Sequence, residues 1–250
     1  MVRKKAVIIT GASSGIGRAT AVELSKRDDV ELFLIARNKE KLARTQDLLL
    51  SEGHHLLTFD VGKTSEIAAL CEEIVGKNSA VTAFVHCAGH SNSEKFHKIT
   101  PEIADGYFHV HVGAFMEFTR VLTMKKERTC PLSIVGITSV TADMPYPFKT
   151  MYAGCKAAIE IMSRTLAAEL WRFNTRINCI RFGSVDTEAY DTYRKAYSTQ
   201  AEFEQMIIDY GQKAGIIPVA EAAETVARLA MDCPSHMTGE VLTYSAALLA

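Results

Sequence analysis

The 250-residue chain has no long hydrophobic run, no excess of one charge and no dense set of cysteines. Because its apolar stretches are shorter than the roughly 18 residues of a membrane span, we expect no transmembrane segment. The formal net charge is −1, which gives no indication of nucleic acid or a membrane surface as a partner. The six cysteines form no C-x-x-C pair, so we expect reduced thiols and a cytoplasmic location.

The chain also lacks a linker rich in proline or glycine, an internal repeat and a low-complexity tract. A length of 250 residues lies within the range of one α/β domain, and we expect residues 1–250 to form a single domain. The first strand-like run, KKAVIITG, begins near residue 4, so we expect no leader peptide.

Seven short apolar runs alternate with helix-like stretches. The runs are continuous, which is typical of strands that are covered on both faces. We expect strands at 4–10, 31–37, 54–60, 80–88, 132–139, 175–182 and 240–245. We expect helices at 15–27, 38–52, 64–77, 101–125, 151–172 and 219–232. This alternation predicts an α/β fold built on a doubly wound parallel sheet, with one irregular zone at 184–214.

A glycine-rich turn follows the first expected strand. The segment TGASSGIGRA (10–19) places Gly11, Gly15 and Gly17 before an apolar helix pattern. Small residues at such a turn let backbone N–H groups approach a pyrophosphate, and the helix N-terminus adds partial positive charge. A generic glycine-rich turn is the alternative, but the strand before it and the helix after it favour a dinucleotide phosphate site.

The second expected strand ends in LIARN, without the acidic residue that usually binds the adenine ribose of NAD. Arg37 stands there instead, and a guanidinium suits the 2′-phosphate of NADP. The alternative is that Arg37 only begins the next helix in solvent. We expect NADP(H) as the cofactor.

Tyr152 and Lys156 lie four residues apart at the start of an expected helix, so both project from one face. A free phenol has a pKa near 10, and a nearby ammonium lowers it. Ser139 ends an expected strand, where its hydroxyl can face the cleft beyond the strand. The Y-x-x-x-K spacing is weak evidence by itself, and it gains weight behind a phosphate-binding turn.

Over its whole length, the chain resembles the short-chain dehydrogenase/reductase (SDR) family. The resemblance is carried by TGASSGIG at 10–17, HCAG at 86–89, Ser139 with YAGCK at 152–156, RINCIRFGSVDT at 176–187 and MTGEV at 237–241. It implies one Rossmann-like domain, commonly assembled as homodimers or homotetramers. It also implies hydride transfer between NAD(P)(H) and a carbonyl/alcohol pair.

The resemblance assigns roles to individual residues. For reduction, Tyr152 donates a proton to the carbonyl oxygen, Ser139 binds that oxygen, and Lys156 lowers the pKa of Tyr152 and binds the nicotinamide ribose. The residues implied to contact the cofactor are Gly11, Ser13, Ser14, Gly15, Ile16, Gly17, Arg37, Asp60, Val61, Ala88, Gly89, Tyr152, Lys156, Val185 and Thr187.

His111 stands where the family has an asparagine, whose local helix kink holds a water on the proton path from the lysine. Thr100 as the N-cap and Pro101 at the first position support a helix there. Three roles for His111 are open: a tolerated substitution that keeps the kink, an imidazole that relays protons, or a weakened relay. We include His111 among the candidate catalytic residues.

Five of the eight histidines lie between positions 86 and 111, which raises the question of a metal site. On a helix, His109 and His111 point about 200° apart, so they cannot chelate one ion together. The sequence has no Cys₂His₂ or HExxH spacing either, and we expect no metal.

Other segments depart from the family pattern or leave two interpretations open. HCAG replaces the usual NNAG, and Phe182 replaces a usual proline, which predicts a looser turn towards the nicotinamide. The 184–214 segment matches the family's substrate-covering region. Its apolar residues either line a substrate pocket or pack the lid onto the body; these are Tyr190, Tyr193, Tyr197 and Met206.

The sequence thus predicts an NADPH-dependent oxidoreductase that reduces a ketone or aldehyde, with Tyr152 as the general acid and base. A 3-oxoacyl thioester and a small or xenobiotic ketone are both open as substrates. The alternative is an NADP(H)-binding regulatory or scaffold protein with little activity, which the departures at 86, 87, 111 and 182 suggest.

Overall fold

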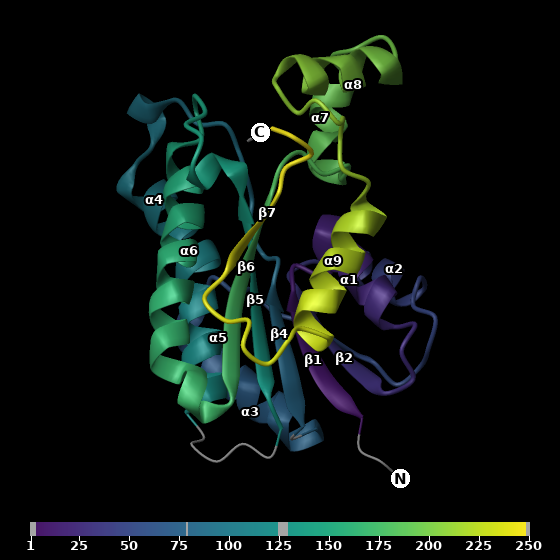
Figure 1. The fold of residues 1–250 in the computed structure, drawn as a ribbon, viewed down its shortest axis with the longest axis vertical. Helices are drawn as coiled ribbons and strands as arrows, with labels where there is room; N and C mark the ends of the chain where they lie inside the picture. Colours follow the sequence, from purple (N-terminus) through teal and green to yellow (C-terminus); the bar gives the residue numbers. More distant parts are fainter. Residues whose placement is uncertain (1–3, 79, 125–129, 249–250) are drawn as a thin grey trace.

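Within the described residues, seven parallel strands form one sheet in the order β3-β2-β1-β4-β5-β6-β7 (Figure 1). The computed structural model describes residues 4–78, 80–124 and 130–248. The strand order reverses between β1 and β4, which is where ligands bind in doubly wound sheets. The strands are β1 (Lys5–Thr10), β2 (Val30–Ala36), β3 (His55–Thr58), β4 (Val81–His86), β5 (Leu132–Ser139), β6 (Thr175–Phe182) and β7 (Val241–Tyr244).

All seven expected strands are confirmed, and two have the expected bounds at 132–139 and 175–182. The central strands are buried on both faces because helices cover the sheet from both sides. In β1, every residue from Ala6 to Thr10 is buried, and in β5 only Ser139 is partly exposed. This burial explains why the strands are continuous apolar runs in the sequence.

Helices cover the two faces of the sheet around two separate cores (Figure 1). No helix of the described residues is long and apolar enough to cross a membrane. The helices of one face are α1 (Gly15–Leu24), α2 (Lys39–Gln46) and α9 (Val219–Met231). Those of the other are α3 (Ile67–Lys77), α4 (Pro101–Phe108), α5 (Ala114–Thr123) and α6 (Thr150–Leu170).

The helix expected at 101–125 is interrupted. Residue 125 lies outside the described residues, and His109–Gly113 between α4 and α5 form a π-helical turn. The N-terminus is as expected, since the Thr100 hydroxyl accepts a hydrogen bond from the Ile103 N–H and Pro101 occupies the first position. A π-turn inserts one extra residue into a helix and reorients the side chains beside it.

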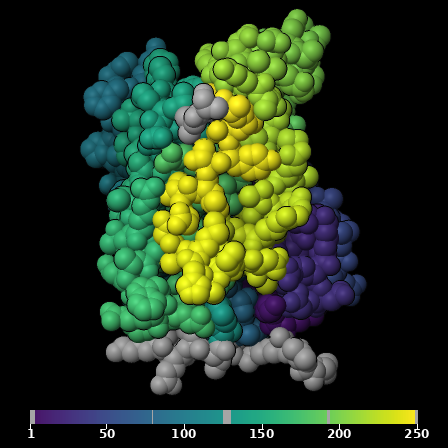
Figure 2. Space-filling model, viewed as in Figure 1, coloured from purple at the N-terminus to yellow at the C-terminus, as the bar shows by residue number. Residues whose placement is uncertain are grey.

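The 184–214 zone is more regular than we expected from the sequence. It contains α7 (Asp191–Arg194) and α8 (Gln200–Asp209). A capping box starts α8, in which Thr199 and Glu202 bond each other's backbone N–H groups. Figures 1 and 2 show this segment standing at the top edge of the molecule, above the carboxyl ends of the strands. The T-x-x-E spacing at residues 199–202 is the sequence pattern that indicates the start of this helix.

Candidate active site

The glycine-rich turn between β1 and α1 requires its glycines for steric reasons. Gly11 has a φ of +69°, and a Cβ there would lie 2.8 Å from the backbone N of Ala88. A Cβ at Gly17 would lie 2.4 Å from the carbonyl oxygen of Gly11. The turn can therefore fold tightly against the end of β4 only without side chains at these positions.

A cleft of about 540 Å³ opens at the carboxyl ends of β1, β2 and β4. It is lined by His111 and by every residue that the sequence assigned to the cofactor except Val185. Ser139 also lies outside this lining. The sequence-based residues thus come together from five separate segments: the Gly-rich turn, 37, 60–61, 88–89 and 152–156. Thr187, from the lid, completes the set.

Tyr152 and Lys156 line one end of this cleft, and Ser139 lies next to Tyr152, just outside the lining. The hydroxyls of Ser139 and Tyr152 are hydrogen-bonded, and the Ser139 Oγ also accepts from the Thr141 N–H at 3.3 Å. The Lys156 Nζ lies 5.5 Å from the centroid of the Tyr152 ring and donates to the Ile137 carbonyl at 2.7 Å. The predicted catalytic group is therefore assembled, because the end of β5 faces the first turns of α6.

Burial has the largest effect on the pKa values at this end of the cleft. Burial raises the pKa of Tyr152 to about 12, although its bond with Ser139 acts in the opposite direction. Burial also lowers the pKa of Lys156 to about 8. That Lys156 lowers the pKa of Tyr152 stays a prediction. The ammonium is directed at Ile137, and the loss of solvent around the phenol has the larger effect.

A family model described as enoyl-(acyl carrier protein) reductase matches residues 11–246. The chain belongs to the short-chain dehydrogenase/reductase family. The sequence-based resemblance is thereby confirmed, together with the Rossmann-like fold.

The SDR relatives include enzymes of named activity. The chain is 27% identical to 3-oxoacyl-(acyl-carrier-protein) reductase FabG of Thermotoga maritima over 246 residues, which are 95% of both chains. It is 24% identical to 1-cyclohexenylcarbonyl-CoA reductase of Streptomyces collinus, with 98% of this chain and 87% of the relative covered. An uncharacterised oxidoreductase of Staphylococcus haemolyticus is 28% identical over 73% of this chain and 79% of its own.

Two solved structures share the SDR fold of this chain. ElxO with NADP bound has a TM-score of 0.88 and 23% sequence identity, and the match covers 98% of this chain and 99% of ElxO. Actinorhodin polyketide ketoreductase with NADPH has a TM-score of 0.87 and 23% identity, with 98% and 97% covered. At these identities, the two structures support the fold.

His111, where this SDR chain departs from the family, lies in the π-turn and is fully buried. Its Nε2 is 3.1 Å from the carbonyl oxygen of His90, and its ring is 5.8 Å from that of Tyr152, edge to face. Its Nδ1 has no hydrogen-bond partner among the described residues. Burial and the charge of Lys156 lower the pKa of His111 to about 2, so this imidazole is neutral.

His86, the first residue of HCAG, is hydrogen-bonded to the backbone of the π-turn. Its Nε2 donates to the carbonyl oxygen of His111 at 3.0 Å, and its Nδ1 accepts from the Thr10 hydroxyl at 2.9 Å. Burial lowers the pKa of His86 to about 3, which fixes the neutral form that this pair of bonds requires. His86 therefore joins β1, β4 and the π-turn.

Exposed cations lie at the end of the cleft that follows β2. Arg37 follows β2, is exposed and lines the cleft, as the sequence indicated. Lys41, in the first turn of α2, lines the same end. Sequence reasoning missed Lys41, and because Arg37 lies before the N-cap Asn38, no helical spacing relates the two cations.

Two expectations concern the segment after β6, a cofactor contact by Val185 and a loose turn at Phe182. Val185 packs its buried side chain in the core and pairs through its backbone with Ile217, so its side chain does not face the cleft. The turn at Phe182 is not loose. The buried amide of Gln212 donates to the Ser184 carbonyl at 2.9 Å and accepts from the Ser184 N–H at 2.6 Å. No local pattern in the sequence predicts this pair of hydrogen bonds between Gln212 and Ser184.

Two of the lid tyrosines pack against α8. The rings of Tyr190 and Tyr197 both meet the buried Phe203 of α8, at centroid distances of 5.7 and 6.0 Å. The side chain of Tyr193 lies outside what the structure describes. In the described part of the chain, no three His, Cys, Asp or Glu side chains are grouped as metal ligands, and His109 is exposed whereas His111 is buried.

Proposed function

We propose that the chain is an NADP(H)-dependent reductase of ketone or aldehyde carbonyls that also catalyses the reverse oxidation. The observation that carries this proposal is the convergence of Ser139, Tyr152 and Lys156 at one end of the cleft behind the glycine-rich turn. The likeness to a 3-oxoacyl-thioester reductase and to a ketoreductase supports carbonyl reduction as the reaction. A 3-oxoacyl thioester and a smaller ketone remain the two substrate classes to compare.

The cleft fits a dinucleotide phosphate. The bare glycines allow the close approach that a diphosphate needs, and the N-terminus of α1 points its N–H groups at the same place. Arg37 and Lys41 at the far end suit the 2′-phosphate that distinguishes NADP from NAD. When bound, the reduced cofactor would supply the hydride.

The residues of this chain would supply the proton and the positioning. A pKa of about 12 keeps the Tyr152 phenol protonated at neutral pH, which is the form that donates to a carbonyl oxygen as the hydride arrives. Ser139, already bonded to Tyr152, would hold that same oxygen. With a pKa of about 8, Lys156 is mostly charged at pH 7 and would stabilise the phenolate that remains.

The neutral, buried His111 fits a positioning role in this mechanism better than that of an acid. Its ring fills the space beside Gly89, where a Cβ would lie 2.4 Å from the His111 Cε1. It thus shapes the cleft wall next to Tyr152 while the π-turn is retained. The comparisons offer no support for the alternative of a regulatory or scaffold protein, and the assembled catalytic group argues against it.

NADPH consumption with a panel of carbonyl substrates tests the proposed function. The panel contains 3-oxoacyl thioesters, aliphatic and aromatic ketones, and aldehydes, each with NADPH and with NADH. We expect turnover with at least one carbonyl and a clear preference for NADPH. Tight NADPH binding without turnover of any member would favour the regulatory alternative instead.

We further propose a homodimer or homotetramer in a reducing, cytoplasmic compartment. All six cysteines are free thiols in the structure, which suits such a compartment. Ile161, in the middle of α6, is 58% exposed and is a candidate contact between subunits. Sedimentation equilibrium measures the assembly, and a monomer at micromolar concentration would contradict it.

A further inference from the structure

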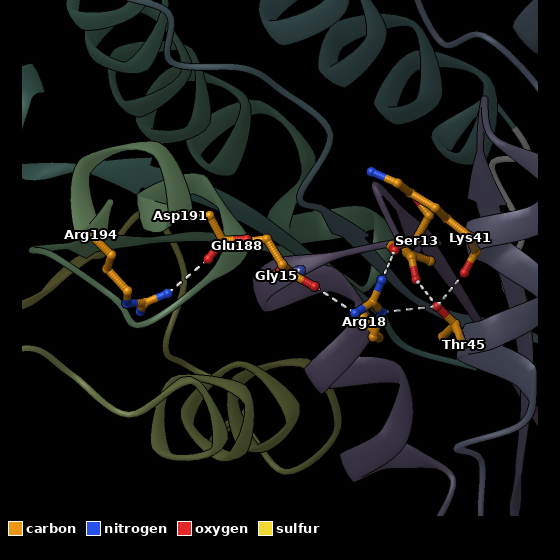
Figure 3. A network of polar contacts seen from close by, with 9 residues as sticks. Ser13, Gly15, Arg18, Lys41, Thr45, Glu188, Asp191 and Arg194 are labelled. Atoms are coloured by element: carbon orange, nitrogen blue, oxygen red, sulfur yellow. Dashed lines mark hydrogen bonds and ion pairs between the residues drawn. The ribbon is translucent and has the colours of Figure 1, made fainter. Parts of the chain in front are cut away.

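The carboxylate of Glu188 occupies the glycine-rich turn. Its Oε2 accepts a hydrogen bond from the Gly15 N–H at 2.8 Å, and its Oε1 lies 2.5 Å from the Arg18 Nη1 (Figure 3). Glu188 belongs to the lid segment after Thr187, 173 positions from Gly15 in the sequence. An anion from the lid is thus bound at the place that the turn offers to a phosphate.

The turn has the properties of an anion site, independently of Glu188. Gly15 is the first residue of α1, whose N-terminus carries partial positive charge. The N-cap residue Ser14 makes no side-chain capping bond within the described part of the chain, and the first turn of α1 has no acidic residue. Although burial acts in the opposite direction, the Gly15 N–H and Arg18 lower the pKa of Glu188, so the carboxylate is charged.

Arg18 is held independently of Glu188. Its Nη2 donates to the Ser13 carbonyl, and its Nε lies 3.4 Å from the Thr45 hydroxyl, which in turn donates to the Ala12 carbonyl (Figure 3). These bonds come from the turn itself and from α2. The guanidinium would therefore stay beside the turn if Glu188 left, and it would face whichever anion replaced the carboxylate.

We infer that Glu188 is a built-in competitor of the dinucleotide diphosphate and so determines cofactor affinity. This inference rests on the proposed function. A diphosphate needs the same N–H groups and would bring a second anion against the carboxylate, so the two cannot share the turn. Binding of NADP(H) exchanges the Glu188 carboxylate for the diphosphate on Gly15 and Arg18.

The exchange links cofactor binding to the lid. Arg194 forms an ion pair with Asp191, which follows Glu188 (Figure 3). It forms another with Asp186, which precedes Glu188, so the residues on both sides of Glu188 are connected. Thr187, the neighbour of Glu188, lines the cleft. Its Cγ2 lies 3.4 Å from the position that a Cβ on Gly15 would occupy, so Thr187 packs against the turn. Release of Glu188 therefore shifts the start of the lid. Cofactor binding thus changes the position of the segment that covers the substrate.

The test compares NADPH binding by the wild-type chain and the Glu188→Gln variant at low ionic strength. Glutamine keeps the shape of the side chain and removes its charge. We expect the Kd for NADPH to fall about three- to fivefold, the effect of removing one anion from a helix N-terminus. The matched control is Glu204→Gln, which removes an exposed carboxylate from α8 of the same lid, where it bonds Gln200. Its Kd should stay within twofold of wild type.

An unchanged or raised Kd in Glu188→Gln, or an equal decrease in Glu204→Gln, would overturn the inference. If neither chain binds NADPH, the proposed function fails, and the same comparison with inorganic pyrophosphate still decides the competition. Tighter pyrophosphate binding by Glu188→Gln supports the inference, whereas no difference or no binding contradicts it.

A measurement on the wild-type chain does not depend on how the variant folds. In protein labelled with ¹³C at the glutamate side-chain carboxyl, Glu188 should titrate below the ordinary glutamate range without ligand. Saturating NADPH should return its pKa to that range, because the carboxylate has left Gly15 and Arg18. The conservative Glu188→Asp variant assigns the resonance. A titration that NADPH leaves unchanged would contradict displacement.

Discussion

The two ends of the cleft hold their ionisable groups in opposite ways. At the catalytic end, Lys156 is 4% exposed and His111 is 0% exposed, and burial decides their charge states. At the diphosphate end, the side chains of Glu188 and Arg18 are 46% and 25% exposed and are held by direct ionic contact. Buried groups have charge states that are costly to change, whereas exposed ion pairs exchange partners readily.

This difference matches two tasks. Proton transfer requires a fixed phenol with a set protonation state, which a desolvated site provides. Cofactor exchange requires contacts that can be replaced by an incoming anion. Substitutions at the catalytic end should therefore alter turnover with little effect on NADPH binding, and substitutions at the phosphate-binding end should do the reverse.

The largest effect is expected from Tyr152→Phe. Loss of the proton donor should reduce kcat about 10³-fold, the scale of general acid catalysis. The Kd for NADPH should stay within about twofold, because the glycine-rich turn and Arg37 are unchanged. Steady-state kinetics and fluorescence titration measure the two quantities. Retained turnover would contradict the role of Tyr152 as proton donor. Lost NADPH binding would contradict the separation of turnover and binding between the two ends of the cleft.

At the proposed adenine end, Arg37→Asp should weaken the preference for NADPH. Replacing the guanidinium by a carboxylate should reduce the preference for NADPH over NADH roughly 30-fold, equivalent to about 2 kcal/mol for a charged hydrogen-bonded contact. The kcat with saturating cofactor should change little. Arg44→Asp, an equal charge change on an exposed residue of α2 outside the cleft lining, is the control. Equal effects of the two variants would exclude a specific 2′-phosphate contact.

The buried imidazoles should make the protein sensitive to acid. The pKa values of His86 and His111 are lowered to about 3 and about 2, below the value of about 6.5 in the unfolded chain. The unfolded state therefore binds more protons, and stability is complete above pH 6.5 and falls as the pH decreases. Between pH 6.5 and pH 5, each imidazole should cost roughly 2 kcal/mol of unfolding free energy.

Urea unfolding of His111→Asn checks this acid sensitivity. The variant should lose roughly 2 kcal/mol less than wild type over the same interval, and His109→Asn, which changes an exposed imidazole, should follow wild type. The same variant tests the relay role. Because the His111 imidazole is neutral throughout, its removal should leave the pH dependence of kcat unchanged between pH 6 and pH 8. A shifted profile would restore His111 as a proton carrier.

The smallest effect is expected in the lid. Thr199→Ala removes half of the capping box of α8 and should cost about 1 kcal/mol of local stability. Hydrogen exchange of residues 200–209 should rise several-fold while the central strands stay protected. Ser198→Ala, at a residue that contributes its backbone N–H to Glu202, is the control. Faster exchange in the central strands would show that the lid and the body unfold together.

Much of the fold and of the site could be predicted because their signals are local. Continuous apolar runs marked all seven strands, and the turn and the Tyr152–Lys156 spacing marked two parts of the cleft. The π-turn at His109–Gly113 and the hydrogen bonds between Gln212 and Ser184 were not predicted, since no short sequence pattern encodes them. The capping box of α8 does have a local signal, the T-x-x-E spacing of Thr199 and Glu202.

The sequence alone determined the order of the elements, the glycine-rich turn and the chemical identity of Ser139, Tyr152 and Lys156. Only the tertiary structure decided which charges these groups carry. It buries His111 and Tyr152 against Lys156, and it brings Glu188 onto Gly15 across 173 positions. The physical reason is that desolvation and ionic contact depend on distances in space, and residue order does not contain those distances.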